Sequence, residues 1–213
     1  TPLFAVIKAY LFFLRHIQII VRVPKMVCGG DSTETATIDY KSTETIIDAF
    51  EKWCSTSPDK AYLCQPMGGD KDNIKNHTFS QVRAEAIKMA TYIAALNLEP
   101  GSRIALMSKN CSWWIIADLA IVMSGHVTVP IYPTLTGGTV EYILEHSDSQ
   151  LCFVGKLDKN PWNEMKNGIP ASMAVVTFPL CPDFDGEAKE KYVTWDSILA
   201  DTKRTAIKPV QRK

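Results

Sequence analysis

The residues best suited to chemistry in this sequence are one cysteine and two histidines. Cys111 precedes an apolar run of helical length, where a helix N-terminus lowers a thiol pKa and can make a nucleophile. No histidine lies within a few residues of Cys111, and a free cysteine more often serves as a small buried apolar side chain. His146 closes a predicted helix, where the dipole favours a cation, and His126 lies in a turn with no carboxylate close by. We therefore assign no catalytic residue.

Two glycine pairs are the candidates for a phosphate cradle. Gly68-Gly69 and Gly137-Gly138 lack both the glycine-lysine loop of a P-loop and the dinucleotide-binding fingerprint. Gly137-Gly138 precedes a predicted helix, whose N-terminus can receive an anion, but glycine is also the ordinary residue of a tight turn. The turns at 108–110 and 132–136 lack the spaced glycines of a nucleotide-dependent oxidoreductase. We assign no cofactor-binding residue.

Cysteine spacing and charge exclude several further classes. The six cysteines form no Cys-x-x-Cys pair and have no histidine at a zinc-binding spacing, which favours reduced thiols in a cytoplasmic compartment and predicts no metal residue. Lysine plus arginine and aspartate plus glutamate both number 23, so no net field indicates nucleic acid as a partner. No basic cluster flanks Trp113-Trp114, which favours core anchors over a base-stacking platform.

The elements that must position these residues alternate between strand and helix. Short apolar runs alternate with helical segments, and polar turns join them; the predicted order is strand 103–107, helix 111–124, strand 127–131, helix 140–146 and strand 150–154. This order predicts an α/β fold with a mostly parallel sheet in a layered helix-sheet-helix domain. Ligands of such sheets lie outside the carboxyl ends of the strands. Pro130 lacks a ladder donor, so its strand lies at an edge of the sheet or ends there. Helix 113–123, apolar apart from Asp118, must be buried on most sides.

The flanking segments continue the pattern. Residues 45–54 predict a short amphipathic helix, 61–64 and 74–77 a pair of strands, and Thr78-x-x-Gln81 a capping box that opens a helix to Leu96. Beyond Gly155 we expect a helix at 161–165, a strand at 174–178, a polar loop at 182–190 and a strand-to-helix piece at 192–199.

Residues 1–27 predict a basic amphipathic helix, followed by a linker at 28–41. Lys8, Arg15 and Arg22 recur every seven residues opposite a wide apolar face, and the charges interrupt the segment too often for a membrane span. Three interpretations stay open: residues 1–25 lie on a membrane surface, act as an import sequence, or pack on the protein or on another subunit. The first predicts a cytoplasmic protein with peripheral membrane association.

Residues 42–200 contain blocks that resemble the N-terminal part of AMP-forming acyl-CoA synthetases, most closely the long-chain fatty acid CoA ligases of the adenylate-forming superfamily. The specific part is Val129-Pro-Ile-Tyr-Pro-Thr134 followed by Glu141-Tyr-Ile-Leu-Glu-His-Ser147; Gly101-Ser-Arg-Ile-Ala-Leu106 and Asn110-x-x-Trp113-x-x-Ala117-Asp118-Leu119-Ala120 support it. The resemblance implies that residues 42–213 form the N-terminal subdomain of an AMP-binding domain.

The resemblance also implies an acid-thiol ligase in the full-length protein. In that reaction ATP, magnesium and a fatty acid form an acyl-adenylate and pyrophosphate, and coenzyme A then takes the acyl group. The family's phosphate loop, aromatic-Gly-x-Thr-Glu block and C-terminal lysine match no position here, so the chain is expected to be a fragment that stops before the phosphate loop and is inactive alone. The alternatives are an aryl- or amino-acid-activating adenylation domain and a non-catalytic membrane-docking module.

Overall fold

The computed structural model describes residues 45–68, 72–182, 192–201, 206–208 and 210. The chain divides into two compact units, residues 1–82 and 83–213, and each is described by itself. The predicted basic helix at 1–27, the linker at 28–41 and all but the first residue of the polar loop at 182–190 lie outside the described residues.

The first unit begins with helix α2, Ile46–Thr56. Thr45 caps it as a complete capping box: the Asp48 N–H donates to Thr45 Oγ1 at 3.2 Å, and the Thr45 N–H donates to Asp48 Oδ2 at 2.9 Å. Ile47, Phe50 and Cys54 form its buried face. Their spacing is that of one helical face, which is why the sequence pattern predicts this helix.

A two-stranded antiparallel sheet completes the first unit. Strand β1, Ala61–Pro66, pairs with β2, Ile74–Thr78, as the sequence predicts. The rings of Tyr62 and Phe79 stack with centroids 4.5 Å apart, and Phe50 lies 5.6 Å from Tyr62. This aromatic cluster joins α2 to the sheet.

Helix α3, Phe79–Ala94, starts in the first unit and continues into the second. The predicted capping box is confirmed, since the Thr78 N–H donates to Gln81 Oε1 at 2.9 Å and the Gln81 N–H donates to Thr78 Oγ1 at 3.2 Å. The helix ends two residues before the predicted Leu96, and the turn that follows holds Asn97 at a positive φ of 52°.

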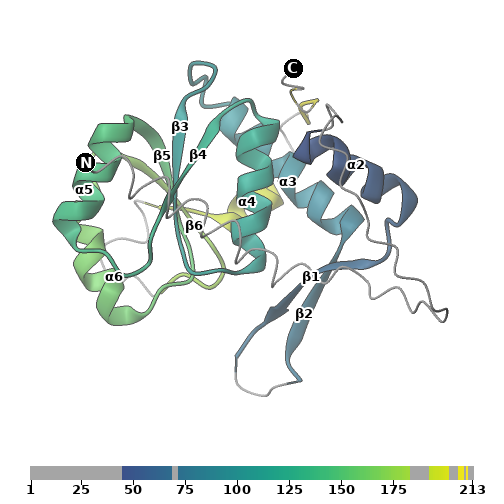
Figure 1. The fold of residues 1–213 in the computed structure, drawn as a ribbon, viewed down its shortest axis with the longest axis horizontal. Helices are drawn as coiled ribbons and strands as arrows, with labels where there is room; N and C mark the ends of the chain where they lie inside the picture. The colour runs from purple at the N-terminus through teal and green to yellow at the C-terminus, as the bar shows by residue number, and fades with distance from the viewer. Residues whose placement is uncertain (1–44, 69–71, 183–191, 202–205, 209, 211–213) are drawn as a thin grey trace, which may run out of the picture. The chain divides into compact units, whose positions relative to one another are not determined.

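The second unit is built on a five-stranded sheet in which every pair of neighbouring strands is parallel (Figure 1). The strands are β3 Arg103–Met107, β4 Val127–Ile131, β5 Ser149–Val154, β6 Ala174–Thr177 and β7 Val193–Thr194, in the order β4-β3-β5-β6-β7. The predicted α/β fold with a parallel sheet is thereby confirmed.

Helices provide the crossovers between these strands. They are α4 Ser112–Met123, α5 Gly137–Ser147 and α6 Lys159–Met165 with the 3-10 turn η1 Lys166–Gly168; α7, Trp195–Ala200, follows β7. The structure starts α5 three residues before the predicted 140–146. The reason is that Thr136 is its N-cap, so the glycine pair forms its first turn.

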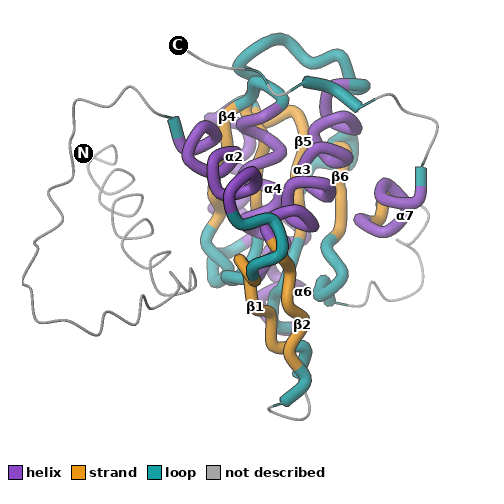
Figure 2. The backbone as a smooth tube through the Cα atoms, turned by 90° about the vertical axis from the view of Figure 1, so that its right-hand side faces the viewer, coloured by secondary structure: helices purple, strands orange, loops and turns teal. Residues whose placement is uncertain are grey.

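Successive side chains of the strands point to opposite faces of the sheet, and both faces are buried along β3 and β5. Ala105, Met107, Cys152 and Val154 join the core cluster with side chains of α5 and α6, while the intervening residues of β3 and β5 are also buried and point to the other face. Figures 1 and 2 show α5 and α6 on one side of the sheet and α3 and α4 on the other. The described sheet therefore lies between two helical layers.

Pro130 lies on the edge strand β4, as predicted. The Val127 N–H donates to the carbonyl of Ser102, just before β3, at 3.0 Å. In a parallel pair alternate residues bond the same neighbour, so Val129 and Ile131 also face β3 and Pro130 faces outward. The missing N–H of Pro130 therefore removes no bond from the sheet.

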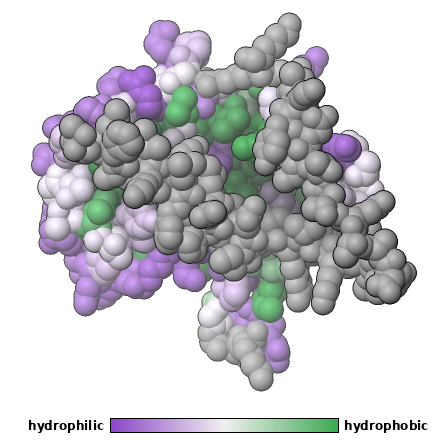
Figure 3. All heavy atoms as spheres, viewed as in Figure 1, coloured by the Kyte–Doolittle hydropathy of each residue, from purple (hydrophilic) through white to green (hydrophobic). Residues whose placement is uncertain are grey.

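Helix α4 is buried on most sides, as its composition predicts. Nine residues are buried: Ser112, Trp113, Trp114, Ile116, Ala117, Leu119, Ala120, Ile121 and Met123. Its single charged residue, Asp118, accepts a hydrogen bond from Thr128 Oγ1 of β4 at 2.6 Å, and desolvation raises the pKa of this carboxyl despite that bond. In Figure 3 apolar residues gather in the upper centre of the visible face, and hydrophilic residues lie along its left-hand edge.

Candidate functional site

The carboxyl ends of the strands are the first place to look for a site in this fold. Here the turns after β3 and β5 close on each other: the Gly155 N–H donates to Met107 O at 2.9 Å, and the Lys109 N–H donates to Lys156 O at 2.8 Å. The Lys109 ammonium also pairs with the Asp158 carboxylate. These bonds use backbone groups that a ligand at this edge would otherwise meet.

Gly155 leaves no free space between these turns. A Cβ at this position would overlap the Phe178 ring and the Ser108 side chain, so the absence of a side chain lets the two turns approach. Ser108 is buried, and its hydroxyl donates to the Lys109 carbonyl at 2.7 Å. The turns that follow β3 and β5 are therefore closely packed against each other at the carboxyl edge of the sheet.

Cys111 is the N-cap residue of α4 and is 3% exposed. Desolvation raises the pKa of its thiol, although hydrogen bonds from the Trp114 backbone and the Ser108 side chain oppose the shift. Burial therefore outweighs the helix N-terminus that could have lowered the pKa. The geometry is that of a buried apolar side chain, since the reactive thiolate form is disfavoured.

The Gly137-Gly138 pair lies at an N-terminus that the protein itself caps. Thr136 Oγ1 accepts from the Thr139 N–H at 3.3 Å, and Glu164 Oε1 of α6 accepts from the Gly137 N–H at 3.3 Å. A protein carboxylate thus occupies the position that an anion would take, so these residues do not fit a nucleotide phosphate.

Close packing explains the first glycine of this pair. A Cβ on Gly168 of η1 would overlap the Gly137 carbonyl oxygen, and a Cβ on Gly137 would lie 2.9 Å from the Glu164 carbonyl oxygen. A Cβ on Gly138 would meet no atom within 4 Å. Gly137 and Gly168 therefore form a backbone-to-backbone contact between α5 and η1, which we call the glycine contact.

The structure does not bring the three candidate residues together. Cys111 follows the carboxyl end of β3, whereas His126 precedes β4 and His146 precedes β5, and the strands are parallel. The cysteine and the two histidines therefore lie at opposite edges of the sheet. His146 stacks on Tyr142 of the same helix with ring centroids 5.4 Å apart.

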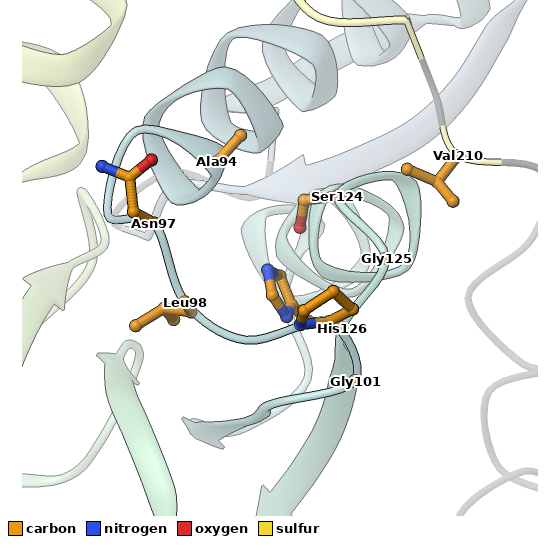
Figure 4. A pocket seen from close by; sticks show the side chains of 9 residues that line it. Ala94, Asn97, Leu98, Gly101, Ser124, Gly125, His126 and Val210 are labelled. Carbon is orange, nitrogen blue, oxygen red and sulfur yellow. The ribbon is translucent and has the colours of Figure 1, made fainter.

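An open hollow of about 770 Å³ lies at the amino ends of β3 and β4, the edge opposite the expected one. Figure 4 shows His126 and Ser124 beyond the end of α4, Asn97 and Leu98 in the turn after α3, and Val210 from the C-terminal segment. The Val210 N–H donates to Met123 O at 2.8 Å, which holds Val210 against the end of α4.

Sequence reasoning missed this hollow. Gly101 and Gly125, with φ of 82° and 84°, were the available signal, because positive φ at both positions turns the chain sharply around it. The described residues that line the hollow include no carboxylate and no lysine or arginine. Within the described residues, no group of three or more histidine, cysteine, aspartate or glutamate side chains is placed to hold a metal ion.

Among the described residues, no helix is both long and apolar enough to cross a membrane. The membrane surface predicted as a partner of residues 1–25 stays a prediction, since that segment lies outside the described residues.

Comparison with known proteins shows where this framework belongs. The sequence matches the AMP-binding enzyme family over residues 50–212. Among solved structures, the anthranilate CoA ligase AuaEII in complex with anthranoyl-AMP superposes with a TM-score of 0.62 at 20% identity, over 78% of this chain and 29% of that one. The described framework therefore has the α/β fold of that ligase, and the chain belongs to the AMP-binding enzyme family.

Two curated relatives carry more specific names. Long chain acyl-CoA synthetase 1 of Arabidopsis thaliana is 38% identical over 77 residues, which is 36% of this chain and 12% of that protein. Long-chain-fatty-acid--CoA ligase heimdall of Drosophila melanogaster is 20% identical over 167 residues, which is 78% of this chain and 24% of that protein. The matched part of the chain thus spans 12% to 24% of these relatives' length.

Proposed function

We propose that this chain supplies the N-terminal part of a long-chain fatty acid CoA ligase. The observation that carries the proposal is the family match over residues 50–212 together with 38% identity to a long chain acyl-CoA synthetase over 77 residues. In the whole protein, ATP and a fatty acid form an acyl-adenylate with release of pyrophosphate. The thiol of coenzyme A then takes the acyl group and AMP leaves.

The role of the described residues in this proposal is to support the chemistry. The glycine contact and the Glu164 cap hold the start of α5, and the joint at Gly155 holds the turns after β3 and β5. These groups form no phosphate or magnesium site, so no reaction step is routed through them. Groups that bind ATP, magnesium and coenzyme A are expected outside the residues described, and the 213-residue chain is expected to be inactive by itself.

A fatty acid is the proposed acyl substrate because the named sequence relatives are long-chain acyl-CoA synthetases and ligases. The anthranilate CoA ligase shares the fold at 20% identity, which supports the fold assignment alone. The proposed acid substrate is therefore taken from the sequence relatives. An aryl-activating enzyme is the competing function.

The experiment compares two acid substrates and two proteins of different length. The purified 213-residue chain and the longest protein read from the same gene are each incubated with magnesium-ATP, coenzyme A and either palmitate or anthranilate, and pyrophosphate and acyl-CoA are measured. The proposal expects palmitoyl-CoA from the longer protein only. Anthraniloyl-CoA without palmitoyl-CoA would show that the assigned substrate is wrong.

A further inference from the structure

Asn167-Gly168 is the only Asn-Gly pair in the sequence, and it lies in the turn η1. Asparagine is a thermolabile residue, and a glycine after it has no side chain to shield its backbone nitrogen. In such a pair that nitrogen can attack the side-chain carbonyl carbon of the asparagine. Asn167 is exposed, so water reaches the carbonyl at which the reaction takes place.

The reaction needs no reactant other than water. The Gly168 nitrogen loses its proton to a base in solvent and forms a bond to Asn167 Cγ, while the side-chain amide nitrogen leaves as ammonia. The product is a cyclic succinimide, and water then opens the ring at either of its two carbonyl groups. One opening gives aspartate. The other gives isoaspartate, in which the main chain runs through the former side chain and is one carbon longer.

The folded structure holds the Asn167 side chain away from this attack. The Ile169 N–H donates to Lys166 O at 3.2 Å and closes the 3-10 turn around Asn167. The Asn167 side-chain nitrogen donates to Asn163 O of α6 at 3.2 Å. Side chains of a helix lean towards its N-terminus, so this bond draws the amide back along α6 and away from the Gly168 nitrogen.

The glycine contact encloses the attacking nitrogen. Gly168 is buried, and its nitrogen lies 3.4 Å from the position that a Cβ on Gly137 would take. Because the amide proton must first reach a base in solvent, the packed nitrogen reacts only when η1 moves away from α5. The contact also has no room for a longer main chain, since even a Cβ on Gly168 would overlap the Gly137 carbonyl oxygen.

We propose that Asn167 is a site of spontaneous deamidation that the glycine contact controls. The succinimide forms while η1 is separated from α5, and the extra main-chain carbon of isoaspartate then prevents the contact from closing again. Chains with isoaspartate therefore accumulate with α5 and η1 apart. The site lies in the supporting framework and is independent of the proposed ligase function.

Deamidation rates of the full chain test the control by the glycine contact. The wild type, Gly137→Ala and Gly138→Ala are aged at neutral pH in native buffer and in urea, and peptide mapping by mass spectrometry quantifies the products at position 167. A Cβ on Gly137 would lie 2.9 Å from the Glu164 carbonyl oxygen, whereas one on Gly138 meets no atom within 4 Å. All three chains keep the Asn-Gly pair, so their rates in urea should be equal.

The native wild type and native Gly138→Ala are expected to deamidate more slowly than in urea by about tenfold or more, since opening a packed contact costs free energy. Native Gly137→Ala is expected to react about tenfold faster than the native wild type, which corresponds to about 1.4 kcal/mol of lost packing. Glu164→Ala removes the carboxylate that accepts from the Gly137 N–H and adds no atom, so it replaces Gly137→Ala if circular dichroism shows that variant to be unfolded. Equal native rates in the opening variant and in Gly138→Ala, or equal wild-type rates in native buffer and in urea, would overturn the proposal.

The effect of the product is measured on the aged protein. Chains with isoaspartate at position 167 are separated by ion exchange and compared with Asn167→Asp, which has the same charge and a main chain of normal length. Thermal unfolding should give a lower Tm for the isoaspartate form than for Asn167→Asp. Equal Tm values would mean that the glycine contact closes over isoaspartate, and the proposal would be wrong.

Discussion

Replacing Gly168 with alanine tests whether the glycine contact holds α5 to η1. The new methyl group would overlap the Gly137 carbonyl oxygen and lie 2.8 Å from the Glu141 backbone nitrogen. Both neighbours are backbone atoms, so no side chain can rotate away and either α5 or η1 must shift. Gly168 does not have a left-handed φ, so steric overlap alone accounts for the effect.

The magnitude follows from two opposing contributions. Adding a methyl to a filled site destabilises by about 1–3 kcal/mol, and backbone overlap places this site at the upper end. Alanine also lowers the conformational entropy of the unfolded chain relative to glycine, which stabilises the folded state by about 0.4–1 kcal/mol. We expect a net loss of about 2 kcal/mol, which for a chain of this size lowers Tm by roughly 4–8 °C.

Gly138→Ala is the matched control, one residue from the contact. A Cβ there meets no atom within 4 Å, so only the unfolded-state contribution remains, and stability should rise by about 0.4–1 kcal/mol. Thermal and urea unfolding followed by circular dichroism measure both variants. Equal stability of Gly168→Ala and the wild type, or equal losses in the two variants, would refute the packing argument.

Three further predictions concern single side chains. Desolvation raises the pKa of Asp118, so its contribution to stability is fully present below the unfolded pKa near 4 and is lost as pH rises through the folded pKa. Between pH 4 and pH 7, the free energy of unfolding of Asp118→Asn should therefore increase relative to that of the wild type. Urea unfolding at the two pH values measures this, and a pH-independent difference would contradict it. Cys111, buried with a raised pKa, should react with iodoacetamide only after unfolding; mass spectrometry of the native protein checks this, and rapid native labelling would be the opposite result. Thr136→Ala should cost about 1 kcal/mol through the lost N-cap of α5, whereas Thr136→Ser should stay close to the wild type; equal unfolding midpoints for the two variants would argue against the cap.

Local patterns carried most of the fold prediction. Apolar runs predicted the strands of the parallel sheet, and Thr78 with Gln81 predicted the capping box that opens α3, because those signals lie within a few residues of one another. Pro130 placed β4 at the edge because one missing donor is visible in the sequence.

Contacts between distant segments could not be predicted in this way. Gly137 contacts Gly168, and the N-terminus of α5 receives the Glu164 carboxylate from α6. The sequence around the glycine pair does not show that carboxylate, so the pair resembled an anion site. Likewise, the position of Cys111 at a helix N-terminus suggested a lowered pKa. The turn that contains Ser108 packs around the thiol, however, and burial raises its pKa instead. Burial depends on partners that only the tertiary structure identifies.

We propose that these 213 residues supply the supporting N-terminal part of a fatty acid CoA ligase. The most direct measurement is palmitoyl-CoA formation by the purified chain and by the longest protein read from the same gene, under identical conditions with magnesium-ATP and coenzyme A. We expect turnover by the longer protein and none by the 213-residue chain. Palmitoyl-CoA formed by the 213-residue chain would contradict it.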